Sequence, residues 1–117
     1  MSLKIVYVDD EPGMCQMFMD NFASETIEII VYTDPLKFLA EFEGLELDLI
    51  ILDYRLPNLN GDDLAATLGN KVPKVLVSGD LKINLKQKYL RTFTKPFDFD
   101  EFEAFLNSFA AEKHYAS

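Results

Sequence analysis

The fold of this chain is decided at residues 3–10, which read LKIVYVDD. Residues 3–8 are rich in β-branched and aromatic side chains, which favours a short β-strand. Two carboxylates, Asp9 and Asp10, follow this run directly. The arrangement recurs: strand-like runs at 49–52, 75–77 and 92–94 are followed by Asp53, Ser78 and Lys95. Residues that follow the strands of an open parallel sheet converge at its carboxyl edge, so we expect these five residues to form one site.

The composition indicates one folded domain. The 117 residues are 49% hydrophobic and include ten Phe and five Tyr, enough for a substantial core, so we expect a single domain over residues 1–117. The formal charge of −9 argues against direct binding to nucleic acid or to an anionic membrane, because both require a basic surface.

The single cysteine, Cys15, excludes a disulfide framework and a cysteine metal site, and it suits a reducing compartment. No apolar run approaches the roughly 18 to 20 residues that a membrane span needs. A cytoplasmic protein without a membrane segment is therefore expected.

Helices are expected to alternate with the strands. The patterns predict a second strand at Ile27–Tyr32 and helices at about 12–24, 34–43, 62–68 and 98–112. Between Gly79 and Arg91 there is room only for a short helix, placed at about Ile83–Leu90. Five strands alternating with five helices imply a doubly wound parallel α/β sheet covered on both faces. Glu28 and the polar alternation of the fifth strand place the second and fifth strands at the edges, which matches the order 2-1-3-4-5.

The acidic residues of the set suit a magnesium ion. Mg²⁺ prefers oxygen ligands in near-octahedral geometry and is usually held by one or two carboxylates together with phosphate oxygens. Asp10 and Asp53 can supply those carboxylates. Three acids brought together without a cation raise the proton affinity of at least one of them, so the metal should bind more weakly at low pH.

The same set can accept a phosphoryl group. Asp53 can attack phosphorus in line, while the metal and the ammonium of Lys95 neutralise charge on the transferring oxygens. Ser78 can donate its hydroxyl to a phosphoryl oxygen, and Gly79 leaves space for the phosphate beside the backbone.

These fragments resemble the response-regulator receiver domains of two-component signalling, whose chemotaxis members have a flavodoxin-like fold. The resemblance covers nearly the whole chain, and its specificity comes from the ordered combination at strand ends. It is carried by Val8-Asp9-Asp10-Glu11-Pro12, Leu52-Asp53-Tyr54-Arg55-Leu56-Pro57 with Gly61, Val77-Ser78-Gly79, and Thr94-Lys95-Pro96-Phe97.

The resemblance implies that Asp53 becomes an aspartyl phosphate, taken from a phosphohistidine of a sensor kinase or a phosphotransfer protein. Asp10, Asp53 and the backbone carbonyl of Arg55 would then bind magnesium, with Asp9 assisting directly or through water. Phosphorylation would pull the Ser78 hydroxyl inward and shift a pre-existing equilibrium on the surface formed by the fourth helix, the fifth strand and the fifth helix, which binds a downstream protein. A receiver of this kind catalyses only its own phosphorylation and dephosphorylation.

The chain departs from the family's pattern in three places. The stretch from Ser78 to Lys95 is several residues shorter than usual, so the helix before the fifth strand should be stunted or irregular. The segment from Gly61 to Ser78 is also short, which trims the third helix. Thr92 stands where the family often has an aromatic residue coupled to the switch, so an aromatic rotamer switch is excluded there.

One further pair of residues could tune the site, and another group could dock a partner protein. Arg55 and Asp80 stand two residues beyond Asp53 and Ser78, so they could pair across the approach path of the phosphate and screen attacking water. Independent, solvated side chains are the alternative, because an exposed pair is worth only about 0 to 1 kcal/mol. Adaptable methionines beside the Lys-Pro junction could dock a kinase or phosphotransfer helix, or could be ordinary surface side chains. The docking residues so predicted are Met14, Met17, Pro96 and Phe97.

Two rival functions stay open. A phosphatase of the haloacid dehalogenase type would need two acids separated by one residue, which only Asp9 and Glu11 provide, and would use Asp9 as its nucleophile. A receiver-like interaction module that is never phosphorylated would keep the fold without using the site. A flavin-binding function fails for want of a Ser/Thr/Gly-rich phosphate loop after the first strand.

Overall fold

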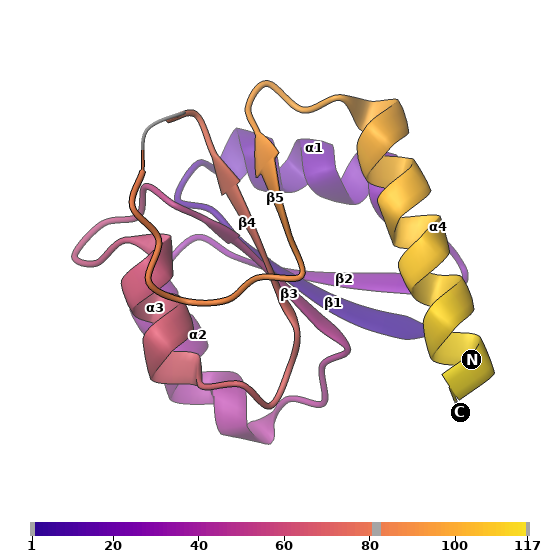
Figure 1. Cartoon of the computed structure of the whole chain (residues 1–117), viewed down its shortest axis with the longest axis horizontal. Coiled ribbons are helices and arrows are strands. Elements are labelled where there is room, and N and C mark those ends of the chain that lie inside the picture. The colour runs from indigo at the N-terminus through magenta and orange to yellow at the C-terminus, as the bar shows by residue number, and fades with distance from the viewer. Residues whose placement is uncertain (1, 81–82, 117) are drawn as a thin grey trace.

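The computed structural model has one parallel sheet with the strand order β2-β1-β3-β4-β5 (Figure 1). The structure describes residues 2–80 and 83–116. The predicted doubly wound fold and its strand order are confirmed, with β2 and β5 at the two edges. The strands are β1 (Leu3–Val8), β2 (Ile27–Tyr32), β3 (Leu49–Asp53), β4 (Lys74–Ser78) and β5 (Arg91–Thr94).

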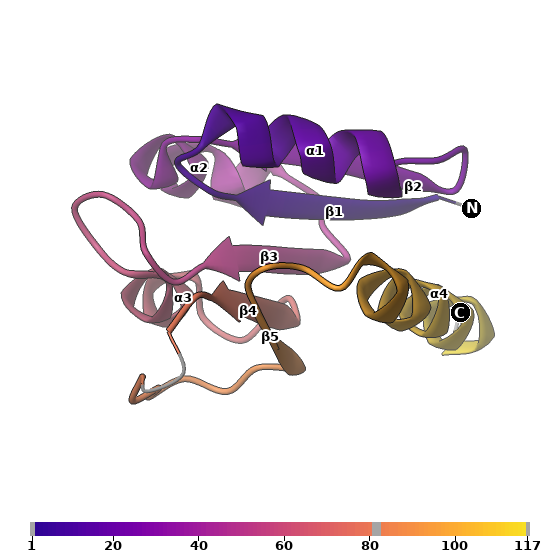
Figure 2. The same ribbon diagram turned by 90° about the horizontal axis from the view of Figure 1, so that it is seen from above.

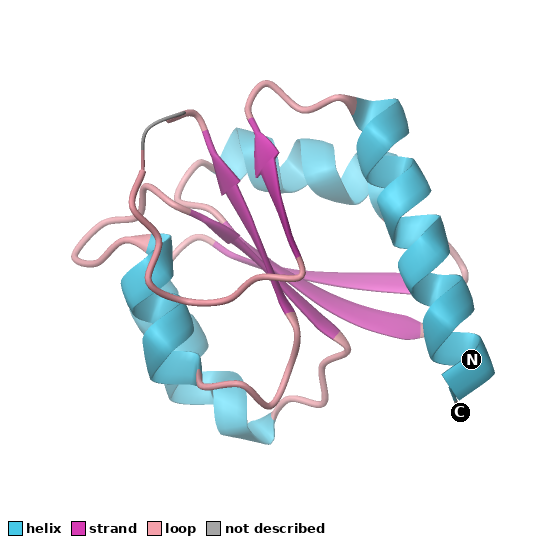
Figure 3. Ribbon diagram, viewed as in Figure 1, coloured by secondary structure: helices cyan, strands magenta, loops and turns pink. Residues whose placement is uncertain are grey.

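Helices connect consecutive strands at three places in the described chain, and a fourth α-helix follows β5 (Figure 3). Side-chain caps begin two of them: the Asp34 carboxylate accepts from the Leu36 N–H at 2.9 Å, and the Asn60 amide oxygen accepts from the Asp63 N–H at 2.8 Å. Such caps satisfy backbone donors that a helix start leaves free. The helices are α1 (Pro12–Phe22), α2 (Pro35–Glu41), followed by the 3-10 helix η1 (Phe42–Gly44), α3 (Gly61–Leu68) and α4 (Phe99–Ala116).

The two faces of the sheet carry separate cores. Ile5 and Tyr7 of β1 pack with residues of α1 and α4, whereas Val6 and Val8 pack with residues of α2 and α3. This division follows from the alternation of side chains along a strand. Figure 2 shows α1 lying along β1 and running in the opposite direction. Among the described residues, no helix is both long enough and apolar enough to cross a membrane.

The predicted short helix over Ile83–Leu90 is wrong, because the described residues 83–90 contain no helix. They form an extended segment that returns past α3 to the start of β5 (Figure 1). A buried carboxylate explains the difference. Asp62 of α3 accepts hydrogen bonds from the backbone N–H groups of Lys86 and Gln87 at 2.8 and 3.1 Å, and from the Tyr89 hydroxyl at 2.5 Å. α3 itself is only eight residues long, as expected from the short sequence around it.

Candidate functional site

The carboxyl ends of four strands meet at one edge of the sheet. β3 and β4 end at Asp53 and Ser78, while Asp9 and Lys95 directly follow β1 and β5. Parallel register places these ends side by side. Asp9, Asp53 and Ser78 are buried, whereas Asp10 is exposed. The structure therefore brings the predicted residues together at a partly enclosed edge.

Lys95 bridges the two buried carboxylates. Its Nζ lies 3.2 Å from Asp9 Oδ2 and 3.2 Å from Asp53 Oδ1. Partial burial works against the charged amine, but the carboxylates of Asp53 and Asp9 outweigh it and raise the pKa of Lys95 above its ordinary value. The ammonium is thus held charged between the two acids.

Asp9 is fixed by neighbours on two sides. The Tyr7 hydroxyl donates to Asp9 Oδ2 at 2.7 Å, and the Glu11 N–H donates to Asp9 Oδ1 at 3.0 Å. Burial, reinforced by the bond to Asp9, raises the pKa of Tyr7, so its phenol stays protonated and remains a donor. The sequence interpretation missed Tyr7. The available signal was its position two residues before Asp9 in a strand-like run, since residues i and i+2 of a strand share a face.

Asp53 carries a raised proton affinity. Burial is the main cause and the nearby Asp9 carboxylate adds to it, while Lys95 and the backbone N–H of Arg55 act in the opposite direction. Together these influences raise the pKa of Asp53 from 3.8 to about 6. Burial therefore contributes more to the raised pKa of Asp53 than the neighbouring carboxylate does.

The acidic cluster fits a hard divalent cation. Asp9, Asp10 and Asp53 each offer a carboxylate oxygen, and the three oxygens lie within 4.8 Å of one another. Oxygen ligands at such spacing suit Mg²⁺, and the exposed Asp10 leaves one side open to water or phosphate. The residues present can therefore bind a metal. The predicted contribution of the Arg55 carbonyl stays a prediction.

Ser78 lies at the site with its hydroxyl turned to the following loop. Its Oγ accepts the Asp80 N–H at 2.9 Å and lies 3.4 Å from the Asp80 carbonyl oxygen. Within the described residues, no hydrogen bond joins Ser78 to Asp53. Donation of the Ser78 hydroxyl to a phosphoryl group on Asp53 would replace its contact with the Asp80 carbonyl oxygen.

The contact predicted between Arg55 and Asp80 is present. An Arg55 guanidinium nitrogen lies 2.6 Å from Asp80 Oδ2, and the two side chains are 75% and 37% exposed. The pair joins the loops that follow β3 and β4. Its effect on attacking water stays a prediction.

Gly61 supports the backbone of Asp53. A methyl group on Gly61 would collide with the Asp53 carbonyl oxygen and would lie 3.1 Å from both the Asp53 carbonyl carbon and Leu76 Cδ1. The Gly61 N–H also donates to the Tyr54 carbonyl oxygen at 2.7 Å. Only glycine lets the start of α3 approach the end of β3 so closely.

The residues predicted for docking and tuning differ in exposure. Met14, Met17 and Phe97 are half-buried, with Phe97 packed against the core of the α1 and α4 face, while Pro96 is exposed. Thr92 is exposed on the edge strand β5. Met17 is therefore not fully solvated, and a docking role for these residues stays a prediction.

The family of this chain follows from comparison with known sequences. The response regulator receiver domain family matches residues 5–107, so the chain belongs to this family, which functions in two-component signalling. The response regulator protein TmoT of Ectopseudomonas mendocina is 28% identical over 101 residues, covering 80% of this chain and 46% of TmoT. The sensory transduction protein RegX3 of Mycobacterium tuberculosis (strain ATCC 25618 / H37Rv) is 30% identical over 76 residues, covering 63% of this chain and 34% of RegX3. The chain spans less than half the length of both relatives.

Solved structures agree with this fold. A CheY-like receiver domain protein from Methanospirillum hungatei JF-1 superposes with a TM-score of 0.85 at 19% identity, over 100% of both chains. The receiver domain of an HD domain-containing protein from Pseudomonas fluorescens Pf-5 superposes with a TM-score of 0.87 at 21% identity, also over 100% of both chains. These similarities support the receiver architecture.

Proposed function

We propose that this chain is a single receiver domain over residues 1–117 that takes a phosphoryl group onto Asp53 in the presence of Mg²⁺. The observation that carries the proposal is the placement of Asp53, buried at the end of β3, ion-paired with Lys95 and grouped with two further carboxylates. An acid in this setting lies beside both a cation and two further potential metal ligands.

The reaction is a direct displacement at phosphorus. A carboxylate oxygen of Asp53 forms a bond to phosphorus while the bond from phosphorus to the donor breaks, and the donor keeps that electron pair. Mg²⁺ held by Asp9, Asp10 and Asp53 would offset negative charge on the phosphoryl oxygens when bound. Lys95 would also offset negative charge on the phosphoryl group, starting from its contact with Asp53 at 3.2 Å.

Residues of the chain would also carry the structural change that follows phosphorylation. Ser78 would donate to a phosphoryl oxygen in place of its 3.4 Å contact with the Asp80 carbonyl oxygen. The loop after β4 then changes its hydrogen bonds, and that loop leads into the 83–90 segment. This change would alter the surface offered to a downstream protein.

The phosphoryl donor is proposed to be a phosphohistidine on a sensor histidine kinase or a histidine phosphotransfer protein. Two-component membership supports this donor class. Met14, Met17, Pro96 and Phe97 would contact the donor protein beside Lys95. A cytoplasmic location agrees with the free, buried thiol of Cys15. The chain would act on no substrate other than its own aspartyl phosphate.

The proposed tuning pair, Arg55 and Asp80, crosses between two loops at the edge of the site. Held together, these side chains would hinder water from approaching the aspartyl phosphate in line. The predicted consequence is a longer phosphoryl lifetime.

Intact mass after incubation with acetyl phosphate and Mg²⁺ tests the proposal. One added phosphoryl group that requires Mg²⁺ and is absent in Asp53→Asn would support it. No adduct, together with failure to bind beryllofluoride, would favour an interaction module that is never phosphorylated. Multiple turnover of a phosphomonoester that depends on Asp9 would favour a phosphatase instead.

A further inference from the structure

Two donors converge on one oxygen of Asp9. The Tyr7 hydroxyl donates to Asp9 Oδ2 at 2.7 Å, and Lys95 Nζ donates to the same oxygen at 3.2 Å. The other oxygen, Oδ1, accepts the Glu11 N–H at 3.0 Å. Asp9 is fully buried, so its hydrogen bonds depend on these protein donors. The two donors on Oδ2 differ, because the Tyr7 hydroxyl is neutral and the Lys95 ammonium is charged.

The neutral donor is fixed in position. The Tyr7 ring is fully buried and stacks on Phe18, with ring centroids 4.3 Å apart and an interplanar angle of 3°. The Phe97 ring packs against the same core, with its centroid 6.5 Å from that of Tyr7. Close packing of this kind restricts a side chain to one rotamer. The Tyr7 hydroxyl is therefore held beside Asp9.

The charged donor is shared between two acids. Lys95 Nζ lies 3.2 Å from Asp9 Oδ2 and 3.2 Å from Asp53 Oδ1, and its side chain is 22% exposed. An ammonium on a flexible stem can change partners without a change in the backbone. A phosphoryl group on Asp53 would bring further anionic oxygens within reach of this ammonium. Lys95 would then move from Asp9 towards the phosphoryl group.

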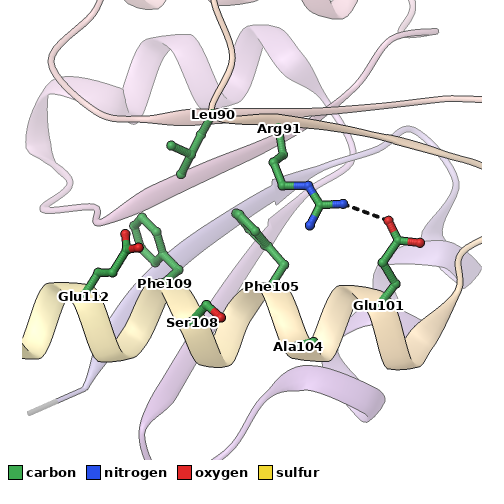
Figure 4. Close-up of a pocket in the computed structure, with 8 residues that line it drawn as sticks. All are labelled: Leu90, Arg91, Glu101, Ala104, Phe105, Ser108, Phe109 and Glu112. Atoms are coloured by element: carbon green, nitrogen blue, oxygen red, sulfur yellow. Dashed lines mark hydrogen bonds and ion pairs between the residues drawn. The ribbon is translucent and has the colours of Figure 1, made fainter.

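Lys95 is the only cation that is ion-paired with Asp9 among the side chains that the structure describes. Arg91 of β5 instead bonds Glu101 at 2.8 Å, beside a cavity of about 420 Å³ that α4 lines (Figure 4). When Lys95 leaves Asp9, the Tyr7 hydroxyl is therefore the described donor that remains on Oδ2.

We propose that Tyr7 is a positioning residue that allows Lys95 to move from Asp9 to a phosphoryl group on Asp53. The Tyr7 hydroxyl keeps Asp9 Oδ2 hydrogen-bonded after the ammonium has left. No proton changes place, because Tyr7 keeps its O–H and Lys95 stays an ammonium in both positions. This inference rests on the proposed phosphorylation of Asp53 and adds a residue that acts on that step through Asp9 and Lys95.

The variant Tyr7→Phe separates this role from packing, because phenylalanine keeps the stacked ring and removes only the hydroxyl. Before phosphorylation, Lys95 still donates to Asp9 and compensates for part of the loss. In the transition state Lys95 has moved to the phosphoryl group, so the loss is felt more strongly there and the reaction slows. The rate constant should fall by about tenfold, the order expected for one hydrogen bond to a charged group.

The first measurement is the rate of phosphorylation by acetyl phosphate, followed by intact mass at Mg²⁺ concentrations that saturate each protein. Saturation removes any effect of Tyr7→Phe on Mg²⁺ affinity from the comparison. The matched control is Tyr32→Phe, which also removes a hydroxyl from a buried tyrosine, one that donates to Glu41 at 2.7 Å. The control should react like the wild type. Equal rates for Tyr7→Phe and the wild type, or equal slowing in both variants, would overturn the inference.

The second measurement follows Lys95 and Tyr7 themselves by NMR. In the wild type, the side-chain resonances of Lys95 should change when Mg²⁺ and beryllofluoride are added, while the hydroxyl proton of Tyr7 stays observable. In the free protein, Tyr7→Phe should shift the Lys95 resonances and Tyr32→Phe should not. Loss of the Tyr7 hydroxyl signal in the beryllofluoride complex would overturn the inference without the need for any variant, as would Lys95 resonances that do not change.

The outcomes also separate this inference from the proposed function. A wild type that is phosphorylated on Asp53, together with a Tyr7→Phe variant that reacts equally fast, would overturn the role of Tyr7 alone. A wild type that neither takes a phosphoryl group nor binds beryllofluoride would overturn both.

Discussion

Lys95 Nζ lies 3.2 Å from Asp53 Oδ1, which places a fixed cation against the carboxylate that we propose is phosphorylated. Asp53 nevertheless has a raised pKa of about 6, because burial and the Asp9 carboxylate together exceed the effect of Lys95. The single ammonium of Lys95 therefore does not neutralise the negative charge of the clustered carboxylates. A bound divalent ion would supply the missing positive charge.

Magnesium affinity should fall as pH decreases through the pKa of Asp53, about 6. A proton on Asp53 competes with the metal, so affinity should be constant well above that pKa and fall by about tenfold per pH unit below it. Calorimetric titration with Mg²⁺ across this range measures the effect. Asp53→Asn should bind more weakly and lose the pH dependence near 6. A wild-type affinity that is flat through this range would contradict the assignment.

Tyr7→Phe should weaken metal binding while keeping the fold. The substitution removes the hydroxyl that donates to Asp9 at 2.7 Å but keeps the ring, which stacks on Phe18 with centroids 4.3 Å apart. Loss of one hydrogen bond to a buried carboxylate should cost roughly 1 to 3 kcal/mol of stability in urea unfolding. Tyr32→Phe is the control, because the Tyr32 hydroxyl bonds Glu41 instead. Equal loss of Mg²⁺ affinity in both variants would show that Tyr7 has no particular role at Asp9.

Asp62→Ala should release the 83–90 segment. It removes the carboxylate that accepts three hydrogen bonds from Lys86, Gln87 and Tyr89, so stability should fall by roughly 2 to 4 kcal/mol. Amide hydrogen exchange at Lys86 and Gln87 should accelerate. The neighbouring Asp63→Ala removes an exposed acid from the same helix start and should cost only about 0.3 to 1 kcal/mol. If both variants leave exchange at these amides unchanged, Asp62 does not hold the segment.

The pKa of Asp62 also gives the sign of its pH effect. Because the folded-state pKa lies below the ordinary value, its stabilising contribution is complete above the unfolded pKa of about 3.9 and is lost as pH falls through the folded value. Acid should therefore loosen the 83–90 segment. Asp62→Ala should show a smaller loss of stability on acidification than the wild type.

Arg55→Ala and Asp80→Ala should each shorten the phosphoryl lifetime, and the double variant should be no faster than either single one. The two side chains form one ion pair at 2.6 Å, so removing either removes the proposed barrier to water. The pair is exposed and worth no more than about 1 kcal/mol, so the lifetime should change by less than about tenfold. Loss of the adduct after removal of the phosphoryl donor is the measurement. Unchanged lifetimes in both single variants would end the screening hypothesis.

The sequence predicts the sheet and its site well because both depend on local patterns. Each short strand-like run ends at a chemically distinctive residue, and parallel register then brings Asp9, Asp53 and Ser78 to one edge. The cap formed by Asp34 at the start of α2 was predictable for the same reason, because Asp34 accepts from a residue only two positions away.

The 83–90 segment could not be predicted in this way. Its conformation is decided by Asp62, which lies 24 and 25 positions before the two backbone groups that it binds. A helix over Ile83–Leu90 would have left the buried Asp62 carboxylate without these donors. The free-energy cost of an unpaired buried carboxylate is not part of local helix propensity. The Arg55 and Asp80 contact was predictable because both residues stand at the same offset from the ends of neighbouring strands.

The most direct test of the central claim is to locate the phosphoryl group. The protein is phosphorylated with acetyl phosphate and Mg²⁺, reduced with borohydride, which converts an aspartyl phosphate to homoserine, and mapped by peptide mass spectrometry. The account predicts homoserine at position 53 alone, and none when Mg²⁺ is chelated before the donor is added. Homoserine at position 9 or 10, or modification at 53 that is independent of Mg²⁺, would contradict it.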